Sequence, residues 1–175
     1  MINMKTVYRV IMTAVLALTL TLTNLCACSS TSYPDRSEEY PDFFTEEDSQ
    51  AEKDVKNMVI GMMIDFNAGK FDKYMNAFSL SSEDRQASLN TYQQLDALYD
   101  QSFSILNMDA TALTETDAQV YFAQETKNVL RQTGELEVHY LSYLLYTMKK
   151  EDGQWKVVDQ KQENIVHIED TAESD

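Results

Sequence analysis

Cysteine is almost absent from this sequence of 175 residues: the only two are Cys26 and Cys28, close to the N-terminus. From Ser29 on, the chain therefore has no disulfide and no cysteine-based metal site. Its two histidines, His139 and His167, stand alone and do not fit a structural zinc site. The sequence also lacks a glycine-rich phosphate loop, a nucleophile elbow and any metal-binding signature. We therefore predict no metal and no cofactor, and a fold that its core alone stabilises.

Basic residues are scarce as well. The chain has 14 Lys and Arg against 29 Asp and Glu, and a formal net charge of −15. Beyond residue 27, 12 basic residues face 29 acidic ones, a formal charge of −17. Binding to nucleic acid or to anionic lipid headgroups needs clustered Lys and Arg, so the composition argues against both. An acidic exterior keeps a protein soluble and can attract cationic partners.

The N-terminus has the three parts of a secretory signal peptide. Two basic residues lie among the first nine, Val10–Leu20 is mostly apolar, and the small residue Ala27 precedes Cys28. Threonines interrupt the apolar run, which is shorter than the roughly 20 apolar residues that span a bilayer. Residues 1–27 are therefore predicted to be a cleaved signal peptide and are excluded from the fold.

The tetrapeptide Leu25-Cys26-Ala27-Cys28 resembles the bacterial lipobox, which is an aliphatic residue, a variable one, a small one and then cysteine. The resemblance implies transfer of diacylglycerol to the Cys28 sulfur and cleavage between Ala27 and Cys28. Acyl chains on one cysteine would hold a soluble domain at a membrane, since each buried methylene contributes about 0.8 kcal/mol. We therefore expect a lipid-anchored protein on the extracytoplasmic side of a cell membrane.

Residues 28–48 are predicted to be an acidic flexible tether, because they combine serine, threonine, proline and an acidic run without periodicity. As a coil of about 20 residues, the tether would span roughly 25 Å. The folded domain is predicted over residues 49–166, and an acidic tail over residues 167–175. Four aromatic residues are unusual in a spacer and suggest docking on the domain or on a partner: Tyr33, Tyr40, Phe43 and Phe44.

Three helices are predicted at the start of the domain. Asp48 or Ser49 can cap the first helix, and a glutamate three residues after Ser49 completes a capping box. Apolar residues at spacings of three and four then form one stripe of an amphipathic helix. A short second helix is predicted over Phe71–Phe78, and a third opens at Ser81 or Ser82.

After the helices, the pattern becomes that of strands joined into an antiparallel meander. Asp152-Gly153 forms a tight turn, because Asp-Gly tolerates positive φ angles. Runs of helices followed by runs of strands predict an α+β domain with the helices on one face of a curved sheet. The predicted strands are Phe103–Asp109, Ala118–Thr126, Val138–Met148 and Trp155–Val166.

The register of the last hairpin stays open at this point. A two-residue loop would place Trp155 on the face of Tyr146, whereas a three-residue loop with a glycine bulge would place it with Leu145. In either register both faces of Val138–Met148 carry large apolar side chains. One face should pack on the helices, and the other is a candidate interface with a protein partner or a second copy. The candidate interface residues are Leu141, Tyr143 and Leu145.

The long first helix, the segment Phe66–Tyr74 that follows it and the late hairpin Lys149–Val158 resemble the nuclear transport factor 2-like superfamily. The resemblance covers roughly residues 50–165. It implies a cone, in which a bent antiparallel sheet wraps around helices and leaves a pocket at the open end. The nearest alternative is the cystatin-like fold, which packs one helix on a similar sheet; three helical segments disfavour it.

In enzymes of this superfamily, the pocket typically holds an aspartate, histidine or tyrosine that acts on a small hydrophobic substrate. The candidate pocket residues here are Asp65, Tyr74 and Tyr140. His139 lies in the middle of a predicted strand, and no sequence pattern supplies the carboxylate that would orient it as a base. It is interpreted as a packed or edge histidine.

The sequence thus predicts a lipid-anchored, non-catalytic binding module of the cell envelope. Such a module would bind a protein partner or a small apolar ligand at the sheet face or at the mouth of the cone. A fold alone does not decide function, so two alternatives stay open. One is a small isomerase-like or dehydratase-like enzyme with a pocket acid or base such as Asp65. The other is a structural or accessory subunit whose main property is dimerisation.

Overall fold

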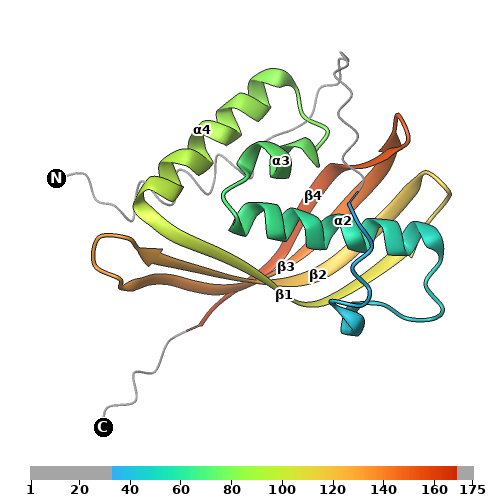
Figure 1. Ribbon diagram of the computed structural model, residues 1–175, viewed down its shortest axis with the longest axis horizontal. Helices are drawn as coiled ribbons and strands as arrows, with labels where there is room; N and C mark the ends of the chain where they lie inside the picture. The colour runs from blue at the N-terminus through green and yellow to red at the C-terminus, as the bar shows by residue number, and fades with distance from the viewer. Residues whose placement is uncertain (1–32, 169–175) are drawn as a thin grey trace, which may run out of the picture.

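The structure, a computed structural model, describes residues 33–168. The predicted signal peptide, the lipobox-like tetrapeptide with Cys28, and residues 169–175 lie outside this described range. Figure 1 shows three helices on one side of a four-stranded sheet. In chain order the elements are η1 (Pro41–Phe43, a 3-10 turn), α2 (Gln50–Asn67), α3 (Phe71–Asn76), α4 (Ser82–Leu98), β1 (Tyr99–Ala112), β2 (Asp117–Leu130), β3 (Leu136–Glu151) and β4 (Gln154–His167).

The sheet is an antiparallel meander with the strand order β1-β2-β3-β4. The helices cover one of its faces (Figure 1), so the predicted α+β cone is confirmed. Each strand has 14 to 16 residues and is longer than the sequence predicts. The reason is that polar residues at the strand ends, which break the apolar alternation, still pair through their backbones; Gln101 opposite Asn128 is an example.

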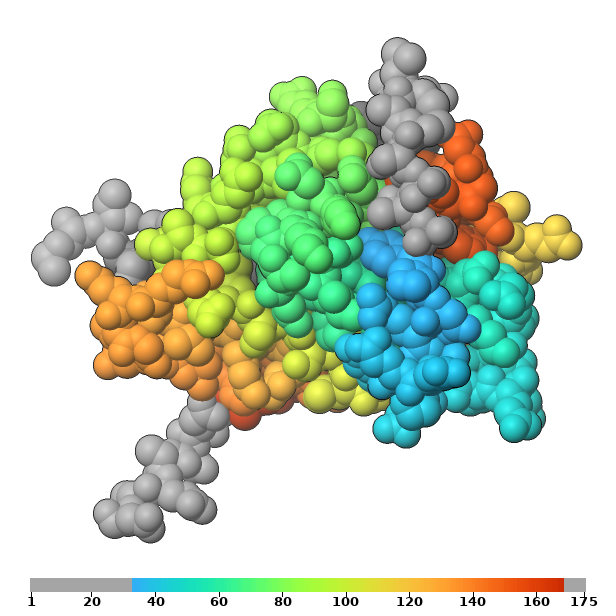
Figure 2. All heavy atoms as spheres, viewed as in Figure 1, coloured from blue at the N-terminus to red at the C-terminus, as the bar shows by residue number. Residues whose placement is uncertain are grey.

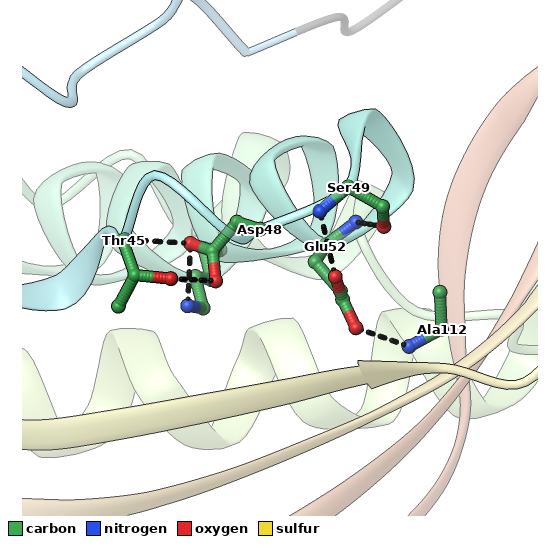
Figure 3. A network of polar contacts seen from close by, with 6 residues as sticks. Thr45, Asp48, Ser49, Glu52 and Ala112 are labelled. Carbon is green, nitrogen blue, oxygen red and sulfur yellow. Dashed lines mark hydrogen bonds and ion pairs between the residues drawn. The ribbon is translucent and has the colours of Figure 1, made fainter.

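The predicted capping box at the start of α2 is confirmed. The Ser49 side chain accepts a hydrogen bond from the Glu52 amide at 3.3 Å, and the Glu52 carboxylate accepts one from the Ser49 amide at 2.7 Å. Glu52 also accepts a hydrogen bond from the Ala112 amide at 3.1 Å, which joins the start of α2 to the end of β1 (Figure 3). These backbone hydrogen bonds from Ser49 and Ala112 lower the pKa of Glu52.

The second helix is shorter than predicted, and the third begins at one of its two predicted positions. Helix α3 ends at Asn76 because Phe78 leaves the helix to form a parallel bridge with Val157 of β4. Helix α4 is capped by Ser81, whose side chain accepts a hydrogen bond from the Asp84 amide at 3.1 Å.

The last hairpin has a two-residue loop, which settles the open register. Glu151 pairs with Gln154, and the loop residues Asp152 and Gly153 have φ angles of 50° and 79°. Two positive φ angles are typical of the type I′ turn that matches strand twist. Trp155 therefore lies on the sheet face that packs against the helices.

The core lies between the helices and the inner face of the sheet. The apolar stripe of α2, residues of α3 and alternate residues of β2 and β3 build it. Within residues 33–168, no helix is long and apolar enough to cross a membrane. The most deeply buried members of the core include Val55, Met62, Val120, Phe122 and Met148.

Residues 33–48, which we call the strap, pack along α2 (Figure 2). The Arg36 amide donates a hydrogen bond to the Asn57 side chain at 2.8 Å. The Lys56 ammonium pairs with the Asp48 carboxylate at 2.7 Å. The structure therefore differs from the predicted flexible tether: its described part docks on the domain, as the aromatic residues of this segment allowed.

Two buried polar residues of α2 explain why the strap docks. Lys56 and Asn57 are only 2% and 5% exposed, and polar groups buried without partners are costly. Asp48 supplies the partner for Lys56 and also accepts hydrogen bonds from the amide and hydroxyl of Thr45 (Figure 3). Burial acts to raise the pKa of Asp48, but the hydrogen bonds from Lys56 and Thr45 outweigh it and lower this pKa.

Candidate functional site

The interior of the cone is filled by side chains. The cavity between α2 and the inner face of the sheet has a volume of about 10 Å³, which is the space for one water molecule. Aromatic rings occupy the rest; Phe66 stacks on Phe103 with ring centroids 3.8 Å apart. Among the described residues, this cavity is therefore too small to hold a substrate.

Tyr74 contributes to this filling. It is buried, and its hydroxyl interacts with those of Tyr92 and Tyr146. Burial raises the pKa of Tyr74 well above its ordinary value, and the neighbouring tyrosines add to the effect. A cluster of satisfied hydroxyls among aromatic rings is the arrangement of a packed core.

Asp65 does not face the cone interior. It shares a face of α2 with Asn57 and Gly61, since residues four apart lie one above the other on a helix. The strap covers this face: a Cβ atom at position 61 would lie 1.9 Å from a ring carbon of Tyr33. Burial, followed by the charge of Asp65, raises the pKa of Tyr33, so Asp65 lies beside the Tyr33 hydroxyl.

The structure thus does not gather the three candidate pocket residues into one site. Tyr140 lies on the inner face of β3, where burial raises its pKa and its hydroxyl interacts with Thr126. Tyr140 lies near enough to Tyr92 to contribute to its raised pKa, after burial, and the ring of Tyr92 packs edge-on against Tyr74 with centroids 5.7 Å apart. Asp65 is apart from both, on the strap side of α2.

His139 has the carboxylate partner that sequence reasoning did not find. Its Nε2 atom lies 2.8 Å from Oε1 of Glu125 on the neighbouring strand β2, and Lys127 lies 3.2 Å from the same carboxylate oxygen. The hydrogen bond from His139 lowers the pKa of Glu125. These residues are neighbours because β2 and β3 pair with Lys127 opposite His139. Nothing in the sequence of either strand indicates which residues of the two strands lie opposite each other.

The three candidate interface residues do lie together. Leu141, Tyr143 and Leu145 occupy alternate positions of β3 on the surface that points away from the helices, which we call the outer face. Tyr121 of β2 is 39% exposed and stacks on Tyr143 with ring centroids 6.3 Å apart. Val166 of β4, opposite Leu141, is 45% exposed. The outer face therefore carries a partly exposed apolar patch across three strands.

A second cavity lies where α2 and α4 end and β1 begins, and we call it the mouth cavity. Its volume is about 300 Å³, at the lower end of the range for ligand pockets. A small apolar ligand is one of the occupants predicted for the mouth of the cone, but most of the side chains that line this cavity are polar or charged. The residues that line it are Phe66, Asn67, Ala68, Gly69, Phe71, Asp96, Asp100, Gln101 and Arg131.

Comparison with protein families gives one match. The model described as the C-terminal domain of the anti-sigma-I factor RsgI9 matches residues 61–168, which is more than half of the chain. The match begins within α2 and includes the whole sheet, whereas the strap precedes it. No curated protein matches the sequence.

Solved structures show the same fold at low sequence identity. A candidate calcium/calmodulin-dependent protein kinase II association domain from Xanthomonas campestris has a TM-score of 0.55 and 12% identity, covering 76% of this chain and 96% of its own. A ketosteroid isomerase-like protein from Erwinia carotovora has a TM-score of 0.51 and 13% identity, covering 65% and 95%. A candidate scytalone dehydratase from Novosphingobium aromaticivorans has a TM-score of 0.51 and 14% identity, covering 66% and 85%. The fold is the nuclear transport factor 2-like cone, and the similarity extends no further than the fold.

Proposed function

The chain belongs to the family of the C-terminal domain of the anti-sigma-I factor RsgI9, and we propose that it is a non-catalytic, lipid-anchored binding module of the cell envelope. The proposal assigns partner binding to the outer face. Its main support is the apolar patch there, in which Tyr121 and Val166 are 39% and 45% exposed. The family name, which is that of a domain in a regulatory factor, agrees with a role in binding.

The outer face has the composition of a recognition surface. Large side chains at its centre are partly exposed: Tyr121, Tyr143 and Val166 lie on three adjacent strands. Aromatic residues are enriched at interfaces because they bury much area at little cost in side-chain entropy. Around them lie charged residues of both signs, such as Glu125 and Lys127, which form a polar rim.

The anchor is the second part of the proposal. The lipobox-like tetrapeptide that ends at Cys28 supports lipidation of that cysteine, and this would place the domain on the extracytoplasmic side of a membrane. Only four residues separate Cys28 from Tyr33, where the strap begins. At no more than about 3.6 Å per residue, that segment would hold the domain close to the membrane surface.

The enzyme alternative has less support. An isomerase or dehydratase needs a cavity that admits substrate to a catalytic acid or base. Asp65 lies on the strap side of α2, and the cavity between α2 and the inner face of the sheet has a volume of only about 10 Å³. Small apolar ligands have less support for the same reason, because the larger cavity is mostly polar.

Charge insertion on the outer face tests the binding surface. A Leu145→Glu variant would place a carboxylate in the apolar patch, opposite Lys161 of β4, and taking this charge out of water in the interface would cost about 3 kcal/mol, or roughly a hundredfold in affinity. Gln93→Glu adds the same charge on the exposed surface of α4 and serves as the matched control. Protein purified from native membranes in neutral detergent is compared by native mass spectrometry. We expect discrete complexes for the wild type and the control, and their loss for Leu145→Glu.

Partner binding at the outer face and lipid anchoring at Cys28 can be contradicted by separate results. Complexes that survive Leu145→Glu unchanged would move partner binding away from the outer face. For the anchor, metabolic labelling with a fatty acid should mark the wild type and not a Cys28→Ala variant. Labelling of neither protein would contradict the anchor while leaving the outer face untouched.

A further inference from the structure

The strap covers a polar face of α2. Lys56, Asn57 and Asp65 of this face are 2%, 5% and 9% exposed. Asp48 of the strap pairs with the first of them at 2.7 Å, and the Arg36 amide donates a hydrogen bond to the second at 2.8 Å. If the strap leaves, water can replace these partners, because it solvates polar groups well. Exposing this face therefore costs less than exposing an apolar one of the same size.

The strap can also leave without unfolding the rest of the domain. It contributes no strand to the sheet, and Tyr33 is the strap residue that packs against the hydrophobic core. Helix α2 keeps its own start, because the capping box of Ser49 and Glu52 lies beyond the end of the strap. Segments with few buried apolar contacts open at a lower free energy than the whole protein.

Electrostatic repulsion opposes docking of the strap. Residues 33–48 contain seven carboxylates and a single basic residue, Arg36, which gives a formal charge of −6. Residues 49–166 contain 18 acidic and 11 basic residues, which gives a formal charge of −7. Strap and domain thus carry net charge of the same sign, and such charge acts against the compact state.

The attraction that holds the strap is buried, whereas the repulsion acts between exposed charges. The side chains of Asp48 and Lys56 are only 10% and 3% exposed. The six other carboxylates of the strap, which is blue in Figure 2, belong to exposed residues. Lys53 attracts one of them, Asp35, and this exposed pair is a small opposing effect. Salt screens exposed charges strongly and a buried pair much less, so rising salt favours docking.

We propose that the strap is a salt-sensitive latch, which docks on α2 at high ionic strength and is released as a unit at low ionic strength while the domain stays folded. Release lengthens the chain between Cys28 and the folded domain. With the strap docked, the distance from Cys28 to Tyr33 is at most about 18 Å; after release, the distance from Cys28 to Ser49 can reach about 75 Å. This gain in reach rests on the lipid anchor proposed above, whereas the release itself does not.

Amide hydrogen exchange, followed by NMR on the ¹⁵N-labelled full chain at pH 7 in neutral detergent micelles, tests this proposal. The Arg36 amide reports opening of the strap, since its acceptor lies on α2, and the Phe122 amide of the central strand β2 reports opening of the domain. We expect Arg36 to exchange at least about a hundredfold faster than Phe122. Between about 0.02 M and about 0.5 M NaCl, exchange at Arg36 should slow about threefold, roughly the value of two like-charge pairs 10 Å apart in water.

Two double variants assign this salt effect. Glu46→Gln with Glu47→Gln removes two exposed charges from the strap. This pair should slow exchange at Arg36 in low salt by about two- to threefold and reduce its dependence on salt. The matched control is Glu83→Gln with Glu135→Gln, which removes the same charge from exposed positions at the start of α4 and in the turn between β2 and β3. The control should leave the exchange at Arg36 close to that of the wild type.

Three results would overturn the proposal. Exchange at Arg36 as slow as at Phe122 would show that the strap opens only when the domain unfolds. Exchange at Arg36 that does not slow as salt rises would contradict the role of repulsion, and equal effects of the two double variants would assign that role to the whole acidic surface. None of these measurements depends on lipid at Cys28, so failure of the latch leaves the proposed anchor and the outer face untouched.

Discussion

Replacement of Gly61 by alanine tests whether the strap is part of the fold. Gly61 is buried in the middle of α2, and its missing side chain leaves room for the ring of Tyr33. A Cβ atom at position 61 would lie 1.9 Å from that ring, far closer than any real contact. The helix backbone cannot yield, so Tyr33 must leave and release the start of the strap.

The expected magnitude combines two opposing effects. Moving the Tyr33 side chain into water loses about 2–3 kcal/mol of apolar burial. Alanine is a better helix former than glycine by about 1 kcal/mol, which acts in the opposite direction. Gly61→Ala should therefore destabilise the protein by about 1–2 kcal/mol. In a Tyr33→Ala background the clash is absent, so the same substitution should stabilise the protein by about 1 kcal/mol.

The assay is denaturant unfolding of the four proteins of this cycle, together with limited trypsin digestion at Arg36. In the wild type the Arg36 amide is bonded to Asn57, so cleavage should be slow; Gly61→Ala should accelerate it. The diagnostic result is that Gly61→Ala lowers the free energy of unfolding in the wild type and raises it in the Tyr33→Ala background. If Gly61→Ala destabilises equally with and without the Tyr33 ring, the reasoning about the strap is refuted.

Three further predictions concern the strap, the turn and the core. The pKa of Asp48 is lower in the folded protein than the ordinary aspartate value of about 4, so ionised Asp48 stabilises the fold at pH values above about 4. This stabilisation is lost as the pH falls through the lower pKa of the folded state, where Asp48 is protonated and its pairing with Lys56 ends. Asp48→Asn should remove this part of the acid dependence in thermal unfolding at pH 2–6; an unchanged pH profile would contradict it. Gly153→Ala, at a φ of 79°, should cost about 1–2 kcal/mol by denaturant unfolding, and no loss would exclude the type I′ turn. Phe122→Ala should open the filled interior at a cost of about 3–5 kcal/mol and let the protein bind a small aromatic probe; a variant of wild-type stability would show that the interior is not packed.

Much of the fold is local and could be predicted from the sequence. The capping box of Ser49 and Glu52 lies within four residues, and the Asp152-Gly153 turn needs only its own backbone angles. Helical and strand periodicities gave the element order for the same reason. The strand ends were missed because residues such as Gln101 pair through the backbone and show no apolar alternation.

The candidate site depended on contacts that no local pattern encodes. The strap has the composition of a flexible tether, and its docking follows only from pairs distant in sequence, such as Tyr33 over Gly61. Lys56 and Asn57, which are buried in α2, could have indicated that another segment covers this side of the helix. Their positions next to the apolar stripe are equally compatible with partly exposed side chains, so the sequence alone does not show that they are buried. The pairing of His139 with Glu125 requires the register between strands. Whether the interior of a cone is open or filled depends on how its aromatic rings pack against one another. Tyr74 and its aromatic neighbours could line an open pocket or fill it, so the sequence does not distinguish the two.

Site-specific photo-crosslinking in the native cells tests most directly whether the outer face binds a protein partner. A benzophenone amino acid replaces Tyr143 on the outer face or, as the control, Gln93 on the exposed surface of α4. We expect discrete crosslinked products from position 143 that are absent from position 93. No product from position 143, or the same products from both positions, would contradict it.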